Sequence, residues 1–467
     1  GIRHGTHVAM MATNSLAYCG GWLALAKVGA VVVSVNTRYT SRELLYVLED
    51  AEVDFLIIES AFLPVLDGIE SIPARILEGN VLLIDTDASE WNKRILAQTP
   101  ELRSARPVSC DDLVNIQYTS GTTGFPKGCM LTHRFWMLSS KLMAEDMHFP
   151  LRRVIYNQNF FYMDGPFLAC LCFFAAATFH FVSRPSASKF LDWVRRYDIE
   201  YCFFFEALFK VPEEDSDGDN SLKFIHTFGF NRSNHAELES RFQVVAREAF
   251  GMTEIGGGLQ MPYHADHMVG SGSCGMPARC REAMIVDDDD RPVNVGEVGE
   301  LLIRGPGMML GYYRKPEANE ETFFGDWLRT GDLFRQDEQG YFYIVGRKKD
   351  MVRKNAENIA CREVEAVLRE LDSVKEAAVV AVADDKVGEE VKAYIQLQDG
   401  YSRTSISPSV ILSHCKERLA AFKVPRYIAY REEFPMTDSA RVEKAKITAQ
   451  SPDLRLDSYD RIDNIWR

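Results

Sequence analysis

The chain has 467 residues, of which 46% are hydrophobic and 26% are charged, and this composition is typical of a globular protein with several domain-sized cores. The net charge of −14 argues against a nucleic-acid-binding protein, because such proteins need a basic surface to meet phosphates. Ten cysteines are scattered from Cys19 to Cys415 without a Cys-x2-Cys pair, which favours reduced thiols in a cytoplasmic protein over a zinc site. No apolar run reaches the roughly 18 residues of a membrane span, so no transmembrane segment is expected.

Apolar strand-like segments alternate with helical ones at the start of the chain. Strands are expected over residues 7–12, 30–35, 53–58 and 81–84, with helices over residues 15–28 and from about Ser41. This alternation predicts a doubly wound parallel sheet, followed by a polar linker over residues 85–110. The chain opens on a turn before a strand, so we expect its N-terminus to be trimmed.

The stretch from Tyr118 to Gly128 concentrates hydroxyl residues, glycines and one lysine in a single turn. Its candidate nucleotide-binding residues are Thr119, Ser120, Gly121, Thr122, Thr123, Gly124 and Lys127. Glycines let the backbone approach a phosphate and present N–H groups as a nest, while the hydroxyls add donors and the lysine adds compact positive charge. A surface turn needs no such combination, and the residue order of a Walker loop is absent, so we predict a phosphate-binding loop of another type.

This loop resembles the signature loop of the AMP-forming adenylating enzymes, a superfamily that includes acyl-CoA synthetases, adenylation domains and firefly luciferase. Motifs in the family's order extend the resemblance from the first residues to about Lys446. The resemblance implies an α/β fold, with a large N-terminal domain of doubly wound sheets plus a distorted β-barrel and a small mobile α+β C-terminal lid. The implied limits are 1–346 for the large ATP- and acyl-binding domain, 347–350 for the hinge, 351–448 for the lid and 449–467 for a polar tail.

The run Phe250-Gly251-Met252-Thr253-Glu254 follows the loop in the family's order. Nucleotide binding needs an aromatic face for adenine, a hydroxyl for phosphate and a carboxylate for the Mg2+ that accompanies ATP. By resemblance, Phe250 stacks on adenine with Gly251 and Met252 in the same site, Thr253 meets the α-phosphate and Glu254 holds Mg2+. Gly256 and Gly257, followed by a third glycine, either leave room for the acid or form a flexible loop.

The resemblance places the acid pocket at two further segments. Tyr162 takes the position of a histidine that gates the pocket in the family, whereas Phe160 and Phe161 before it are interpreted as core. A predicted strand over residues 224–229 ends at Gly229, and this strand end lines the pocket and flanks adenine in the family. The bulk of Phe230 would narrow one side of the pocket.

Two downstream residues complete the expected nucleotide site. Asp332 belongs to the run Thr330-Gly331-Asp332 at an expected strand end. Its carboxylate can accept hydrogen bonds from both ribose hydroxyls, as an acidic residue does in dinucleotide-binding folds. By resemblance, Arg347 contacts ribose or phosphate and Lys349 is the hinge residue.

The lid departs from the family pattern at two places. The usual Gly-Gly-Glu-Asn is replaced by Asn355-Ala356-Glu357-Asn358, where Ala356 would be strained if glycine's conformation is needed. Arg441 occupies the position of the lysine that bridges the acyl carboxylate and the α-phosphate; it keeps the charge but differs in shape. Lys444 or Lys446 could substitute for it through a register shift.

The sequence thus predicts a ligase that uses ATP and Mg2+ to form an acyl-adenylate and then transfers the acyl group to coenzyme A. The expected catalytic residues are Lys127, Thr253, Glu254 and Arg441, with the lid rotating about Lys349 between the half-reactions. CoA is preferred as acceptor because no carrier domain follows the lid, and because the segment after Phe161 lacks the immediate Phe-Asp pair with which amino-acid adenylation domains hold an ammonium. The alternatives are transfer to a separate acyl carrier protein, a luciferase-type oxygenase, and a degenerate nucleotide-binding protein without ligase activity. The sequence leaves the acid and the oligomeric state open.

Overall fold

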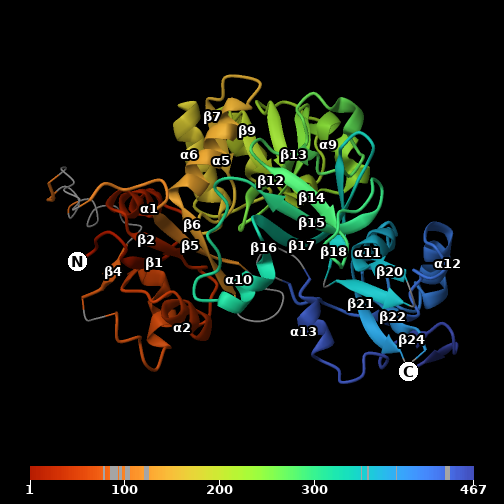
Figure 1. Cartoon of the computed structure of the whole chain (residues 1–467). Helices are drawn as coiled ribbons and strands as arrows, with labels where there is room; N and C mark the ends of the chain where they lie inside the picture. Colours follow the sequence, from red (N-terminus) through yellow and green to blue (C-terminus); the bar gives the residue numbers. More distant parts are fainter. Residues whose placement is uncertain are drawn as a thin grey trace. The chain divides into compact units, whose positions relative to one another are not determined.

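The computed structural model describes residues 1–76, 79–84, 93, 97–99, 106–119, 126–348, 350–354, 357–384, 386–436 and 442–467. These residues form two compact units. Unit 1 comprises Gly1–Thr119, Pro126–Ala283 and Ile303–Leu328, and unit 2 comprises Met284–Leu302 and Arg329–Arg467. Figure 1 colours both units along the chain.

The first sheet of unit 1 has the strand order β4-β3-β1-β2-β5-β6. Its strands are β1 (His7–Met11), β2 (Val31–Ser34), β3 (Phe55–Ile58), β4 (Val81–Leu83), β5 (Leu113–Thr119) and β6 (Lys127–Thr132). The helical segments between them are α1 (Leu16–Val28), α2 (Ser41–Asp50), η1 (Ser60–Phe62) and α3 (Leu63–Asp67). All pairs are parallel except β6, which returns antiparallel to β5, so the predicted parallel sheet is confirmed.

Helix starts in this unit follow local capping chemistry. Ser15 accepts a hydrogen bond from the Tyr18 backbone N–H at the start of α1, and Thr40 with Glu43 forms a capping box on α2. Thr132 caps α5 in the same way, because its side chain accepts a hydrogen bond from the Phe135 backbone N–H.

The second sheet of unit 1 has the order β13-β12-β11-β10-β9-β7-β8. Its strands are β7 (Arg153–Tyr156), β8 (Thr178–Phe181), β9 (Tyr201–Phe204), β10 (Phe224–Thr227), β11 (Val245–Met252), β12 (Gly256–Gln260) and β13 (Met276–Pro277). The accompanying helices are α5 (His133–Glu145), α6 (Asp164–Ala175), α7 (Phe190–Tyr197), α8 (Glu206–Phe209), η2 (Arg232–Asn234), α9 (His235–Phe242) and η3 (Asp266–Met268). β7 to β11 pair in parallel, and β12 turns back antiparallel to β11. The carboxyl ends of the parallel strands therefore meet at one sheet edge, where ligands bind in open α/β folds.

The third sheet has the order β14-β15-β17-β16, with β18 paired to β17. Its elements are β14 (Glu282–Val286), β15 (Val298–Arg304), α10 (Pro316–Thr322), β16 (Phe323–Phe324), β17 (Trp327–Gln336) and β18 (Phe342–Arg347).

The fourth sheet belongs to unit 2 and has the order β20-β19-β22-β23-β24-β25, with β21 paired to β22. Its strands are β19 (Met351–Lys354), β20 (Glu357–Ala360), β21 (Val374–Asp384), β22 (Gly388–Leu397), β23 (Tyr427–Tyr430), β24 (Tyr459–Asp460) and β25 (Ile465–Trp466), and its helices are α11 (Cys361–Arg369), α12 (Pro408–Arg418) and α13 (Lys444–Thr448). α11 and α12 bury their apolar faces against this sheet. The last residues of the chain pair into the same sheet through β24 and β25.

Throughout the described ranges, each helix is too short or too polar to cross a membrane.

Candidate active site

Thr253 and Glu254 lie in a tight turn between two antiparallel strands of unit 1. β11 and β12 pair through Gly251 with Gly257 and Met252 with Gly256, and a bulge separates Phe250 from Gly251. A side chain at position 251 would bring its Cβ to 2.6 Å from the Gly256 carbonyl oxygen, so the strands approach this closely only because residue 251 is glycine. The turn fixes the hydroxyl of Thr253 and the carboxylate of Glu254 at the end of a paired strand.

The glycines expected to leave room for the acid lie in strand β12 itself. Gly256 has φ of +69°, a conformation that favours glycine, so its identity serves the backbone. A Cβ at Gly257 would meet no heavy atom within 4 Å. Of these two positions, Gly257 is the one with open space beside its Cα.

Glu254 and Lys127 are joined through Tyr312. Glu254 is only 6% exposed, and its Oε1 accepts a 2.7 Å hydrogen bond from the Tyr312 hydroxyl. The Lys127 ammonium lies 4.2 Å from the centroid of the same tyrosine ring. Burial and the charge of Glu254 raise the pKa of Tyr312 far above its ordinary value, so its hydroxyl stays protonated and donates.

Tyr312 was not among the residues predicted for the site. It comes from the segment after β15 and reaches Lys127 at the first position of β6, a contact between distant parts of the chain. Thr119 ends β5 opposite Lys127, and its hydroxyl is 3.4 Å from the Lys127 carbonyl oxygen.

Arg281 is a second residue that sequence analysis missed. Its guanidinium donates to the carbonyl oxygens of Ile255 at 2.7 Å, Gly257 at 3.2 Å and Pro306 at 2.5 Å. Burial lowers the pKa of this guanidinium to about 10, which leaves it charged at neutral pH. Arg281 therefore ties the turn that carries Glu254 to the segment that leads to Tyr312.

The end of β10 is held by a buried carboxylate. Glu248 accepts a 2.6 Å hydrogen bond from the Thr227 hydroxyl and a very short one from the Gly229 backbone N–H. Gly229 has φ of 66°, so the strand end turns in a conformation that suits glycine. Phe230 packs edge-on against Phe209, with ring centroids 5.4 Å apart.

The aromatic segment before α6 contains two core residues, Phe160 and Phe161, and one more exposed residue, Tyr162. Phe160 and Phe161 are buried, which confirms their assignment to the core. Tyr162 is half-buried, and its ring centroid lies 4.6 Å from that of Phe161. A carbonyl of this segment, that of Phe161, accepts a 2.8 Å hydrogen bond from the Gln117 side chain in β5.

In unit 2, the two residues expected at the ribose contact each other. Asp332 is 3% exposed and faces Arg347 across the β17–β18 ladder, with Oδ1 and Nε 2.9 Å apart. Asp332 lies inside β17 rather than at the expected strand end. Gly331 beside it has φ of 70° and donates its N–H to the Glu300 carboxylate.

Several predicted residues lie outside the described residues. They are Ser120, Gly121, Thr122, Thr123, Gly124, Lys349, Ala356 and Arg441. The two lysines considered as substitutes for Arg441 are described, and both are engaged by carboxylates. Lys444 contacts Asp350 and Glu365 at 2.5 Å each, and Lys446 contacts Glu443 at 2.6 Å.

A single carboxylate of unit 1, that of Glu254, fits a role as a protein ligand of Mg2+. Within the described part of the chain, no three His, Cys, Asp or Glu side chains cluster as a metal site. Mg2+ is commonly held by one or two carboxylates together with substrate phosphates and water. Glu254, with one carboxylate oxygen fixed by Tyr312, fits the protein's share of such a site.

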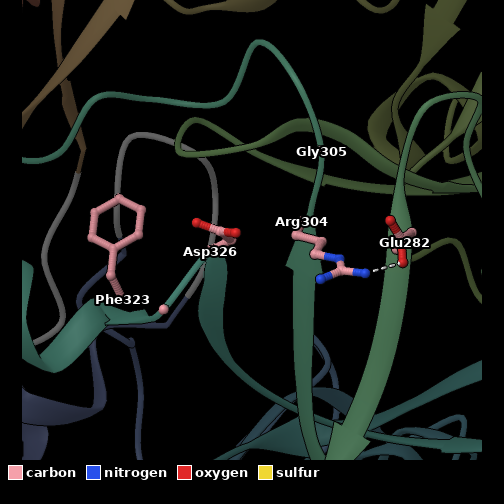
Figure 2. Close-up of a pocket in the computed structure, with 6 residues that line it drawn as sticks. Glu282, Arg304, Gly305, Phe323 and Asp326 are labelled. Carbon is pink, nitrogen blue, oxygen red and sulfur yellow. Dashed lines mark hydrogen bonds and ion pairs between the residues drawn. The ribbon is translucent and has the colours of Figure 1, made fainter.

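A separate pocket of about 490 Å3 opens beside β15 and β16, and Figure 2 shows its lining. The lining residues are Glu282, Arg304, Gly305, Phe323, Gly325 and Asp326. Arg304 donates to Glu282 at 2.6 Å and lies 4.5 Å from the Trp327 ring centroid, so its charge is already balanced. These residues differ from those predicted for the nucleotide and the acid.

Comparison with known protein families gives two matches, one to the N-terminal part of the chain and one to the C-terminal part. The family described as AMP-binding enzyme matches residues 1–313, and its C-terminal domain matches residues 363–441. Among curated relatives, the crotonobetaine/carnitine–CoA ligase of Salmonella paratyphi B is 31% identical over 96% of this chain and 89% of the relative.

Solved structures show the same similarity. ATP-bound MatB from Rhodopseudomonas palustris superposes with a TM-score of 0.87 at 25% identity, covering 97% of this chain and 90% of that one. The o-succinylbenzoate CoA synthetase MenE from Bacillus subtilis, solved with its acyl-adenylate intermediate, gives 0.82 at 25% identity, covering 96% and 88%. The predicted fold, of a large N-terminal domain and a smaller C-terminal one, is confirmed.

Proposed function

Because the chain belongs to the AMP-binding enzyme family, we propose how its own residues carry out the reaction of an AMP-forming carboxylic acid–CoA ligase. In the first half-reaction, a carboxylate oxygen bonds to the α-phosphorus of ATP and pyrophosphate leaves. In the second, the CoA sulfur bonds to the acyl carbon and AMP leaves. Neither half needs a side-chain nucleophile, so the protein contributes positioning and charge stabilisation.

The observation that carries this proposal is the set formed by Lys127, Tyr312 and Glu254 in unit 1. The Lys127 ammonium, which lies over the Tyr312 ring, is available to phosphate oxygens. The Glu254 carboxylate, which accepts from the Tyr312 hydroxyl, is available to Mg2+. Thr253, the residue before Glu254, adds a hydroxyl. Tyr312 holds Glu254 in one orientation, and Arg281 holds the turn behind it. Charge that develops on the phosphates thus meets groups that are already in place.

Mg2+ supplies charge neutralisation for the phosphates of bound ATP when it is present. Glu254 is its proposed protein ligand. Thr253 is proposed to donate its hydroxyl to the α-phosphate, and Phe250, Gly251 and Met252 to form the adenine side of the site.

The roles in unit 2 and in the phosphate loop rest on the family resemblance. Residues 120–124 are proposed to cradle the phosphates, and Arg441 to bridge the acyl carboxylate and the α-phosphate. Asp332 and Arg347 are proposed to bind ribose. In doing so, they would replace part of the ion pair between them with hydrogen bonds to the ribose hydroxyls. Lys349 is the proposed hinge, at the 347–350 limit between a 1–346 domain and a 351–448 lid.

Substrate and acceptor follow from the relatives. Their name makes crotonobetaine and carnitine the first acids to test. The pocket is proposed to include Tyr162, Gly229, Phe230, Gly256 and Gly257. Coenzyme A is the proposed acceptor, and a separate acyl carrier protein is the alternative that the same adenylate chemistry allows.

The proposed compartment is the cytoplasm. None of the ten cysteines, all of which lie in the described part of the chain, forms a disulfide bond, which fits a reducing environment.

The proposal is tested by acid-dependent pyrophosphate release from Mg·ATP, with and without CoA, in the wild type and in Glu254→Gln. The substitution keeps the shape and the acceptor oxygen for Tyr312 but removes the charge. We expect kcat/KM to fall by roughly 100-fold or more, because a preorganised charge in the site is lost. Glu282→Gln is the matched control, since Glu282 is 63% exposed and pairs with Arg304 outside this set. Equal activity in wild type and Glu254→Gln would contradict the role of Glu254, and no release with any acid would contradict ligase activity.

A further inference from the structure

The segment between β7 and α6, which leads to Tyr162, is held by an amide side chain from outside its own sheet. Asn14 lies between β1 and α1 and is 5% exposed. Its Nδ2 donates to the carbonyl oxygens of Gln158 at 2.7 Å and Val182 at 2.8 Å, and its Oδ1 accepts from the Phe160 backbone N–H at 2.7 Å. A neutral amide suits this position, because it donates and accepts at once without bringing a charge into the interior.

A second amide holds the next residue of the segment. Gln117, in β5 of the first sheet, is also 5% exposed, and its Nε2 makes the hydrogen bond to the Phe161 carbonyl. β5 ends two residues later at Thr119, which pairs with Lys127 of the nucleotide site. The same strand therefore supports both the segment before Tyr162 and two residues of the nucleotide site.

These contacts fix four consecutive residues, 158–161, that belong to no helix or strand. The carbonyl of Asn159 completes the set, since it accepts from the buried Tyr156 hydroxyl at 3.1 Å and from the Tyr162 backbone N–H at 3.1 Å. Each of the four residues thus has a backbone group bound by a buried side chain. Because Tyr162 comes directly after them, these hydrogen bonds decide where its backbone lies.

Asn220 makes the same pattern of three hydrogen bonds elsewhere in unit 1. It donates to the carbonyl oxygens of Asp217 at 2.7 Å and Phe242 at 2.9 Å, and it accepts from the Leu222 backbone N–H at 2.9 Å. It precedes the amino end of β10, whereas Gly229 of the proposed acid pocket follows the carboxyl end of that strand. Removal of the Asn220 amide therefore costs comparable hydrogen bonds but leaves residues 158–161 intact.

We propose that Asn14 and Gln117 are positioning residues that place Tyr162 for binding of the acid. Without either amide, the segment before Tyr162 samples other conformations, and acid affinity falls with the fraction of molecules in the binding conformation. The Glu254 turn is held by separate contacts, those of Tyr312 and Arg281, so ATP affinity is retained. This inference rests on the proposed function, because Tyr162 belongs to the proposed acid pocket.

The test compares Asn14→Ala and Gln117→Met with the control Asn220→Ala. Methionine has nearly the length of glutamine but cannot donate a hydrogen bond. Pyrophosphate release gives the KM for the acid and the KM for ATP, with crotonobetaine, carnitine, butanoate and any further acid that the wild type activates. We expect the acid KM to rise about 10-fold or more in both variants, because a buried backbone group loses its partner, while the ATP KM stays within about twofold. Asn220→Ala should lower the thermal unfolding temperature, as Asn14→Ala does, but leave both KM values within about twofold.

Other outcomes overturn the inference. An equal rise in the two KM values, an acid KM that stays at the wild-type value, or a rise in Asn220→Ala as large as in Asn14→Ala would make both amides structural residues only. Gln117→Met loses one hydrogen bond and keeps its volume, so it carries the test if Asn14→Ala does not fold, and failure of both variants to fold would count against a positioning role. A wild type that releases no pyrophosphate with any acid would instead contradict the proposed function itself.

Discussion

At the residue scale, Tyr312 orients the Glu254 carboxylate, and Arg281 holds the turn that carries Glu254. Glu254 and Lys127 stand out because their motifs match a family order. Tyr312 and Arg281 do not, because one acts through a ring and a hydroxyl and the other through backbone carbonyls. Backbone partners leave no trace in residue types, so a buried arginine without a carboxylate cannot be found from sequence.

Arg281 is predicted to be a positioning residue for the turn that carries Glu254. Arg281→Met removes its donors from the Ile255, Gly257 and Pro306 carbonyls, so the turn loses its fixed geometry. We expect kcat to fall by roughly 10- to 100-fold, or about 1.4–2.7 kcal/mol, with a smaller change in the KM for ATP. Steady-state kinetics measure this split, and added guanidinium ion should restore part of kcat.

The control for this prediction is Arg279→Met, the same change two residues away. Arg279 is 50% exposed and pairs with Glu145 and Asp146. It should stay within about twofold of wild type, since exposed ion pairs contribute little. Equal losses in the two variants, or a drop in thermal stability without a change in kcat, would show that Arg281 is merely structural.

At the element scale, periodicity and capping residues predict most helices and strands, and the misses have physical causes. β12 begins with three glycines, which sequence reasoning assigns to open space or a flexible loop because glycine disfavours strands. Asp332 was expected at a strand end, but the strand continues past Gly331. β24 and β25 are two residues each, and their pairing is set by long-range contacts that a polar tail does not reveal.

The buried carboxylate Asp460 explains how those last strands are held. It is 0% exposed and accepts from Arg426 at 3.2 Å and from Arg467 at 2.9 Å. Burial by itself raises the pKa of Asp460, but the hydrogen bonds from the two arginines and from two backbone N–H groups together outweigh burial, and the pKa lies below its ordinary value. The C-terminal residue Arg467 thus fastens β25 to the sheet of unit 2.

Asp460→Asn is predicted to destabilise unit 2 by about 3 kcal/mol at pH 7, because two arginines lose a buried partner. The folded pKa is depressed, so this stabilisation is present above the unfolded pKa of about 3.9 and is lost as pH falls through the folded value. Urea titrations should therefore show a difference in the free energy of unfolding between wild type and variant, and this difference should become smaller below about pH 4. Asp463→Asn, at a position 45% exposed, should cost under about 1 kcal/mol. A difference in unfolding free energy that does not change with pH would contradict the stabilising role of the Asp460 ion pairs.

At the scale of the whole molecule, motif order along the chain was enough to predict the fold and the reaction. No single motif carries that inference, because each short run occurs by chance in unrelated loops. Sheet order and the contact of Lys127 with Tyr312 could not be predicted, since they depend on packing between distant segments. The roles of Arg441 and Lys349 and the domain limits remain predictions.

In this enzyme, a carboxylate oxygen of the acid is expected to attack the α-phosphorus of ATP. The most direct measurement supplies the acid with 18O in its carboxylate and determines the label in the products by mass spectrometry. We expect one labelled oxygen in AMP for each acyl-CoA formed, because the bond broken in the second half-reaction joins the acyl carbon to that oxygen. Labelled inorganic phosphate with ADP, or AMP without label, would show that another phosphorus is attacked or that no acyl-adenylate forms.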